Sequence, residues 1–143
     1  MFLDEIFPTP IWGFDLDMDV DSIKYWCYSC MKENPGRVIS NVGGWQSEDY
    51  REFGNTPLTE LVLYIVKESH NIANDIGIPK GDRWIENLWI NINPKYSYNQ
   101  VHVHPEARLS GVFYVSAPEK SGDICFTRPN GYSLGTVAPN STR

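Results

Sequence analysis

Apolar residues recur at intervals of three and four between residues 19 and 32, and this spacing predicts a helix with one buried face. The positions of that face are Ile23, Trp26, Cys27 and Cys30. Asp19 is a typical N-cap residue, and Asn34-Pro35-Gly36 ends the pattern. Because both cysteines lie on the buried face beside a tryptophan, we interpret Cys-x-x-Cys as a pair of structural thiols rather than as a zinc or redox motif.

A second helix is predicted between residues 57 and 76. Thr56 is suited to cap it, Pro57 to take its first position and Gly77 to end it. Its buried face is expected to comprise Leu58, Leu61, Val62, Ile65, Ser69, Ile72, Ala73 and Ile76. His70 falls beside this face, so we interpret it as a partly exposed helical histidine.

From residue 83 onward the pattern changes to an alternation of apolar and polar residues, which is typical of strands. Strands are predicted at residues 84–93, 98–104, 109–116, 123–127 and 131–137. Two prolines make residues 6–14 an extended opening segment, and the glycine-rich residues 36–55 are predicted to form a long loop of the kind that is often functional.

The order of the elements, helices first and strands afterwards, predicts an α+β fold with a mostly antiparallel sheet or barrel. We expect one domain over residues 1–143, with a helical part at about 19–77 and a β part at about 83–139.

Composition narrows the classes of function. The chain has 143 residues and a net charge of −6, and it contains no cluster of five or more Lys and Arg, so we expect no nucleic-acid partner. No apolar run is long enough to span a membrane, and the start of the chain does not resemble a secretory signal. Three cysteines, an odd number, are typical of reduced thiols, and we therefore expect a cytoplasmic protein.

The candidate site is a pair of histidines, His102 and His104, within a predicted strand. Alternate residues of a strand share a face, so the two imidazoles can bind one cation while Val101 and Val103 point to the other side. Imidazole suits iron, zinc, copper or nickel, but not calcium or magnesium. Solvent-facing strand histidines are the alternative interpretation.

Asparagine is disfavoured in strands. Asn91 and Asn99 therefore indicate hydrogen-bonding roles, such as the orientation of a ligand or substrate.

Seven short blocks of the sequence carry a wider resemblance. They are residues 7–12 (FPTPIW), 41–47 (NVGGWQS), 89–94 (WININP), 99–105 (NQVHVHP), 109–115 (LSGVFYV), 121–126 (SGDICF) and 128–129 (RP). In this order they resemble a family of 2-oxoglutarate- and Fe(II)-dependent oxygenases found in marine bacteria and their phages, over nearly the whole chain. The resemblance implies a double-stranded β-helix, a jelly-roll and cupin-like core, preceded by the two helices.

The resemblance also implies cofactors and site residues. Fe(II) would be held by His102, as the first ligand, and by His104, which stands where oxygenases of the jelly-roll class usually have a carboxylate. 2-Oxoglutarate would be the cosubstrate. Cofactor binding is expected from Arg128, Tyr98, Asn91 and Asn99. Further residues considered for an anion or pocket role are Arg108, Tyr96, Trp45 and Gln46, and core packing is an equal interpretation of the aromatic ones.

The distal histidine and the basic 2-oxoglutarate anchor of the class have no counterpart before Arg143. We therefore expect the C-terminal strands of the jelly roll to be incomplete and the activity of the oxygenase to be in doubt, with the catalytic residues unknown. Candidates for a third ligand are His70, Glu106 and Asp123. The substrate is not readable from the sequence.

Two alternatives to an oxygenase stay open. One is a cupin-like metal protein, although Arg108 and Leu109 stand where a cupin has its glutamate. The other is a non-catalytic binding or assembly protein. Because an incomplete barrel leaves strand edges and apolar surface uncovered, a homodimer is expected.

Overall fold

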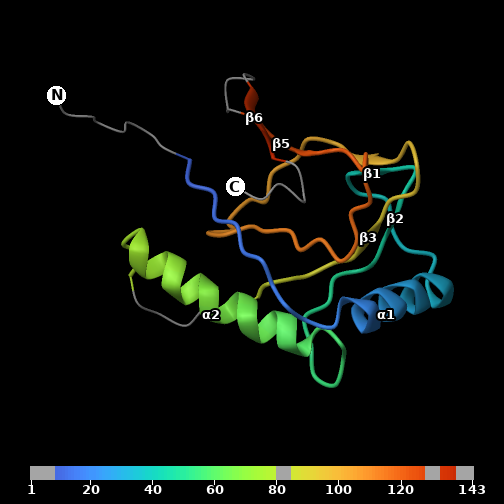
Figure 1. The fold of residues 1–143 in the computed structure, drawn as a ribbon, viewed down its shortest axis with the longest axis horizontal. Coiled ribbons are helices and arrows are strands. Elements are labelled where there is room, and N and C mark those ends of the chain that lie inside the picture. The colour runs from blue at the N-terminus through green and yellow to red at the C-terminus, as the bar shows by residue number, and fades with distance from the viewer. Residues whose placement is uncertain (1–8, 80–84, 128–132, 138–143) are drawn as a thin grey trace.

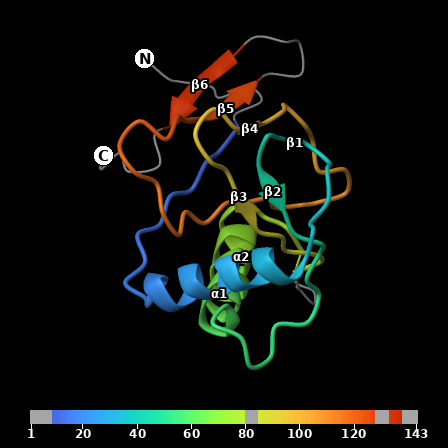
Figure 2. The same ribbon diagram turned by 90° about the vertical axis from the view of Figure 1, so that its right-hand side faces the viewer.

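The computed structural model describes residues 9–79, 85–127 and 133–137, the last of these as backbone only. Its elements are α1 (Val20–Glu33), β1 (Asn41–Val42), β2 (Trp45–Gln46), α2 (Thr59–Asp75), β3 (Asn91–Ile92), β4 (Tyr98–Asn99), β5 (Ile124–Thr127) and β6 (Ser133–Val137). The two helices lie together at one end of the molecule and the strands at the other (Figures 1 and 2). This arrangement is α+β, as the order of the predicted elements indicated.

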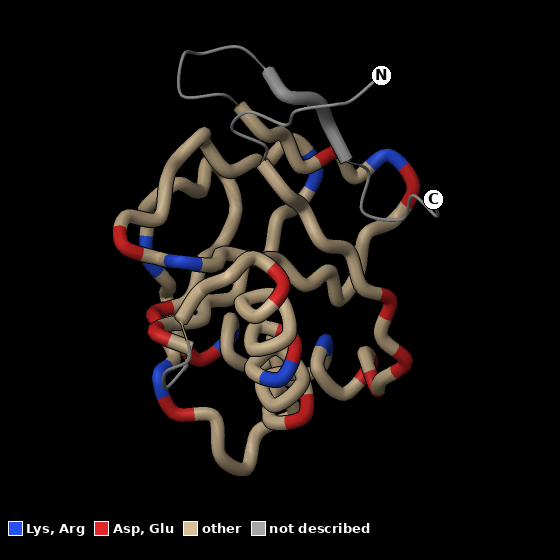
Figure 3. The backbone as a smooth tube through the Cα atoms, turned by 90° about the vertical axis from the view of Figure 1, so that its left-hand side faces the viewer, with Lys and Arg blue, Asp and Glu red and all other residues tan. Residues whose placement is uncertain are grey.

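Helix α1 has the bounds and the cap that the sequence predicted. The side chain of Asp19 accepts a hydrogen bond of 3.0 Å from the backbone N–H of Ser22, and these bonds to Ser22 lower the pKa of the Asp19 carboxyl. The helix ends at Glu33, and the N–H of its C-cap residue Asn34 donates to the carbonyl of Cys30. Asp21 and Glu60 lie in the first turns of α1 and α2, where the helix dipole favours negative charge. Figure 3 shows Asp and Glu residues at many places along the backbone.

Helix α2 begins two residues later than expected, so its N-cap is Leu58 and the prediction that Thr56 caps it was wrong. The hydroxyl of Thr56 accepts a hydrogen bond of 3.3 Å from the N–H of Leu58, in the turn that leads into the helix. At the other end Gly77 has φ +72°, and the N–H of Ile78 donates to the carbonyl of Ala73 over 2.8 Å. This is the helix-ending geometry for which glycine is suited.

The core joins both helices to the segment before β3. Its buried residues are Ile23, Cys27, Leu58, Leu61 and Ile90. The first four lie on the predicted faces of the two helices, which confirms these faces, although Ile76 at the end of the second face is exposed. Within the described part of the chain, neither helix has an apolar stretch long enough to cross a bilayer.

The strands pair as three antiparallel two-stranded sheets, β1 with β4, β2 with β3 and β5 with β6. The predicted strand at 123–127 is confirmed by β5, and β6 lies within the predicted 131–137. Among the described residues the sheets do not close into a barrel, so the jelly roll remains an expectation.

Three strand predictions were too long or wrong. Within the predicted strand at 84–93, the described residues 85–93 contain only β3 and a single bridge at Leu88. Residues 98–104 contain only β4, and residues 109–116 contain no strand. The alternation of side chains is real in such segments, but a strand also needs a hydrogen-bonding partner along its edge. Tyr96 and Glu106 have positive φ and turn the chain away from a continuous edge.

The interpretation of residues 36–55 as a loop was wrong in part, because they contain β1 and β2. Strands of two residues are too short to give an alternating pattern, and the glycines between them dominate the composition. A Cβ atom at Gly44 would collide with the side-chain oxygen of Asn93, so glycine lets β2 approach the segment after β3.

Replacing Leu61 with Ala is expected to lower the free energy of unfolding by about 2–5 kcal/mol, because it leaves a cavity in the core. Leu61 is 3% exposed, whereas Leu63 in the same helix is 66% exposed. Leu63→Ala is therefore the matched control, with an expected change of about 0.5 kcal/mol or less. Urea unfolding followed by circular dichroism measures both variants. Equal losses would contradict the burial of Leu61.

Candidate metal centre

The segment that carries the histidines is held in place by residues 37–50. The N–H of Ser47 donates to the carbonyl of Ile90 over 3.0 Å, and the N–H of Ile90 donates back to the Ser47 hydroxyl over 2.9 Å. Further along, the N–H of Gln100 donates to the carbonyl of Ser40 over 2.7 Å. Gln100 is two residues before His102, so this bond fixes the point from which the histidine segment, residues 101–104, leaves the sheet.

The prediction that both histidines lie on a β-strand was wrong, because β4 ends at Asn99. The prediction that they share a face is confirmed: the ring centres of His102 and His104 are 4.9 Å apart. An ion about 2.1 Å from each ring nitrogen lies about 3.3 Å from each ring centre, so two ligands at about 90–110° have centres roughly 4.6–5.4 Å apart. The observed separation of 4.9 Å falls in this range.

The Nδ1 atoms of both rings are already engaged within the protein. Nδ1 of His102 is 2.7 Å from the carbonyl oxygen of Gln100, and Nδ1 of His104 is 2.6 Å from the hydroxyl of Ser110. A carbonyl only accepts hydrogen bonds, so Nδ1 of His102 carries the proton and Nε2 carries the lone pair. Metal-binding histidines in proteins are held in the same way, by a partner on the other nitrogen.

His104 is the more enclosed member of the pair. The ring of Trp89 meets it edge to face, with centres 5.2 Å apart, and the side chain is half-buried, while that of His102 is exposed. Burial lowers the pKa of His104, and the neighbouring His102 lowers it further. Both effects favour the neutral imidazole, which is the form that binds a metal.

A third protein ligand is not found among the residues that the structure describes. Within them, no group of three His, Cys, Asp or Glu side chains is placed to hold one ion. His70 is partly buried in α2, as interpreted, and its Nδ1 is 2.8 Å from the carbonyl oxygen of Val66. Glu106 and Asp123 are exposed.

The asparagines make the hydrogen bonds that the sequence indicated, with partners inside the protein. The side-chain amide of Asn99 donates to Ser40 over 3.2 Å and to Asn91 over 3.4 Å, and its oxygen accepts a bond of 2.9 Å from Asn93. These contacts tie β3, β4 and the start of β1 together. A role of Asn91 and Asn99 toward a cofactor stays a prediction.

The remaining pocket candidates lie in different surroundings. The indole N–H of Trp45 donates to the carbonyl of Asn34 over 3.0 Å and the ring packs against the core, which agrees with the core interpretation. Gln46 is buried, whereas Tyr96, Tyr98 and Arg108 are exposed. Arg128, the expected cofactor-binding arginine, lies outside the described residues.

Two contacts of the site were missed at the level of sequence, those of Trp89 and Ser110 with His104. Both residues belong to blocks that resemble the oxygenase family, but no spacing rule connects them to the histidine. Ser110 reaches His104 because Glu106, in the turn between them, has φ +68°. A positive φ at glutamate leaves no signal in a sequence.

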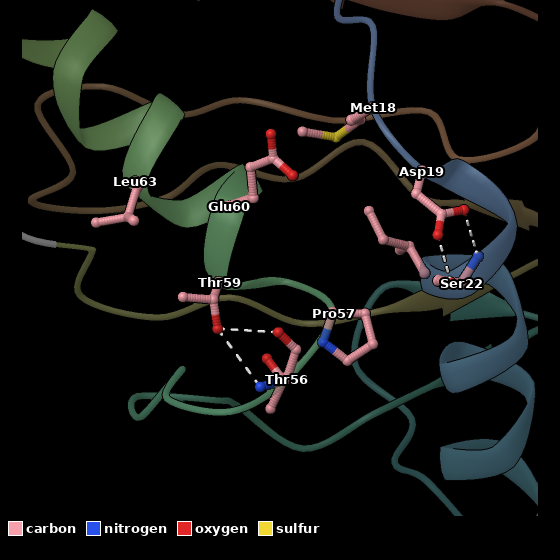
Figure 4. A pocket seen from close by; sticks show the side chains of 9 residues that line it. Met18, Asp19, Ser22, Thr56, Pro57, Thr59, Glu60 and Leu63 are labelled. Carbon is pink, nitrogen blue, oxygen red and sulfur yellow. Dashed lines mark hydrogen bonds between the residues drawn. The ribbon is translucent and has the colours of Figure 1, made fainter.

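A cavity of about 420 Å³ lies away from the histidines, between the N-termini of the two helices (Figure 4). Its lining residues are Met18, Asp19, Ser22, Ile23, Thr56, Pro57, Thr59, Glu60 and Leu63. None of them belongs to residues 85–127. The cavity is therefore separate from the candidate metal centre.

Comparison with known proteins gives a family match, and it includes the region of the histidine pair. Residues 87–142 match the model of a family described as "Putative 2OG-Fe(II) oxygenase". The matched stretch contains His102 and His104 and leaves out both helices. Neither a curated protein nor a solved structure gives a significant match to the chain.

The cysteines differ in exposure. Cys27 is buried, and its burial raises the pKa of the thiol to about 11, whereas Cys125 in β5 is exposed. Since the thiolate is the nucleophile, we expect an aromatic disulfide reagent to modify Cys125 fast and Cys27 only on unfolding. Absorbance of the released thiol measures both phases. Cys125→Ser should remove the fast phase and Cys27→Ser should leave it. A fast phase that survives in Cys125→Ser would contradict this assignment.

Proposed function

We propose that the chain is a 2-oxoglutarate- and Fe(II)-dependent oxygenase of the hydroxylase type and that His102 and His104 hold its iron. The observation that carries this proposal is the pair of facing imidazoles, 4.9 Å apart, within the stretch that matches the oxygenase family. Imidazole is a suitable ligand for ferrous iron. The family also supports a jelly-roll arrangement for the β part.

The residues around the pair have separate tasks in this proposal. The bound iron and 2-oxoglutarate would supply the oxidising chemistry. His102 and His104 would present Nε2 to the ion, since Nδ1 of each contacts a neighbouring oxygen. Trp89, which covers one edge of His104, would keep water from that side of the site. Arg128, Tyr98, Asn91 and Asn99 are proposed to bind the cosubstrate.

A second candidate is a metal-binding protein without oxygenase activity. The observation that favours it is the donor set, because two imidazoles are the ligands available in the described part of the chain. An oxygenase site of this class usually has three protein ligands. Both candidate functions predict binding of the ion, but only the oxygenase predicts turnover of 2-oxoglutarate.

For either candidate we propose a homodimer, formed through an apolar strip of Val38, Ile39, Val101 and Val103. These side chains are between 65% and 83% exposed and lie on two segments joined by the bond from Gln100 to Ser40. An exposed apolar patch of this kind is typical of a protein–protein contact. The strip carries no charge, so two copies of an acidic chain can meet there without repulsion.

The double variant His102→Ala, His104→Ala is expected to lose Fe(II) binding, because it removes both imidazoles. Anaerobic titration with Fe(II) measures binding, and conversion of 2-oxoglutarate to succinate measures turnover. His70→Ala is the matched control and should keep wild-type affinity, since His70 is a helical histidine bonded to its own helix. Binding that survives in the double variant would contradict the proposed site. Binding without succinate in the wild type would favour the metal protein without activity.

Val101→Asp is expected to convert the dimer to a monomer, because it places two carboxylates in an apolar interface. Val112→Asp is the control, since Val112 is also exposed but lies outside the strip. Sedimentation equilibrium at micromolar concentration distinguishes the species. A monomeric wild type, or equal dissociation in both variants, would contradict the strip as the interface.

A further inference from the structure

The turn after the histidine segment brings a hydroxyl group back onto His104. The N–H of Ala107 donates to the carbonyl of His104 over 3.3 Å, and Glu106 has φ +68°. The chain therefore reverses, and the hydroxyl of Ser110 comes within 2.6 Å of Nδ1 of His104. The two atoms are therefore within hydrogen-bonding distance.

Ser110 is the hydrogen-bond partner of Nδ1 in the surroundings of the His104 ring. Trp89 lies against the ring of His104, and His102 faces it from within the segment. No other hydrogen bond of the Ser110 hydroxyl is found within the described residues, so its oxygen is free to accept a hydrogen bond from the imidazole N–H. If Nδ1 carries the proton, Nε2 carries the lone pair.

We propose that Ser110 is a positioning residue for His104. Its hydroxyl accepts the hydrogen of Nδ1 and thereby holds the ring in the tautomer and orientation in which Nε2 is a metal ligand. Gln100 gives His102 the same tautomer through its carbonyl oxygen, so the two rings present equivalent nitrogens. The consequence for metal affinity rests on the proposed function, whereas the effect on the tautomer does not.

The tautomer can be measured in the metal-free protein. Nitrogen-15 NMR of the histidine rings, at a pH where His104 is neutral, distinguishes a proton on Nδ1 from one on Nε2. The wild type is expected to carry it on Nδ1. Ser110→Ala should shift the population toward Nε2, and Ser110→Thr, which keeps the hydroxyl, should restore the wild-type spectrum. Ser121→Ala is the control, because the Ser121 hydroxyl donates to Pro118 in a separate turn.

Metal affinity is measured on the same variants with Co(II) alone, by titration calorimetry. Ser110→Ala is expected to weaken Co(II) binding by about 10-fold, in the range known for residues that orient metal-binding histidines. Ser110→Thr and Ser121→Ala should bind within about 3-fold of the wild type by the same reasoning.

Each outcome decides between the possibilities. A wild-type proton on Nε2, or a spectrum unchanged in Ser110→Ala, overturns the role of Ser110 whatever the affinities are. In a second outcome the tautomer shifts in Ser110→Ala and is restored in Ser110→Thr, but the protein binds neither Co(II) nor Fe(II). This outcome supports the positioning contact and overturns the proposed metal function. A tautomer shift with weaker binding, both restored by threonine, supports the two together.

Discussion

The pairing of residues 37–50 with residues 88–100, which we call the seam, is the constraint on which the rest of the structure depends. Its centre is Ser47, which is 2% exposed and exchanges two hydrogen bonds with Ile90, 43 residues away. Around it, Tyr50 pairs with Leu88, and Trp45 with Ile92. The bonds of Ser47 matter because a buried polar group that is left unbonded costs more free energy than a bonded one contributes.

This seam couples the two parts of the molecule. Ile90 bonds with Ser47 and also belongs to the core of α1 and α2, so the helices and the histidine region share one packed unit. At the far end of the seam the bond from Gln100 to Ser40 is the last contact before residues 101–104. A shift of one residue in this register would turn the side chains over and move the histidines away from Trp89.

Local signals in the sequence were sufficient for the helices. Asp19 and Gly77 act within a few residues of their own position, so a cap or a helix end can be recognised from its neighbours. The strands depend on partners such as Asn41 and Asn99, which are far apart in the sequence. Alternation at 98–104 predicted which side chains share a side, but not that the segment lacks a partner strand beyond Asn99.

In the candidate site, too, a local pattern predicts some contacts, whereas others depend on residues outside the segment. The facing of His102 and His104 follows from alternation within one short segment, and the sequence predicted it. The contact with Ser110 depends on a turn with an unusual backbone conformation, and the contact with Trp89 depends on the seam; neither is encoded in a local pattern.

The two histidines are consequently supported to different degrees. His104 is held from outside its own segment by Trp89 and Ser110, whereas His102 is held by Gln100, two residues before it. Val101 and Val103 alternate with the histidines and are exposed, so nothing in the described chain packs behind the segment. A surface that covered these valines would restrict His102 as much as Trp89 restricts His104. Because binding that rigidifies one site lowers the entropic cost of binding at the other, dimerisation and metal binding would then strengthen each other by the same factor.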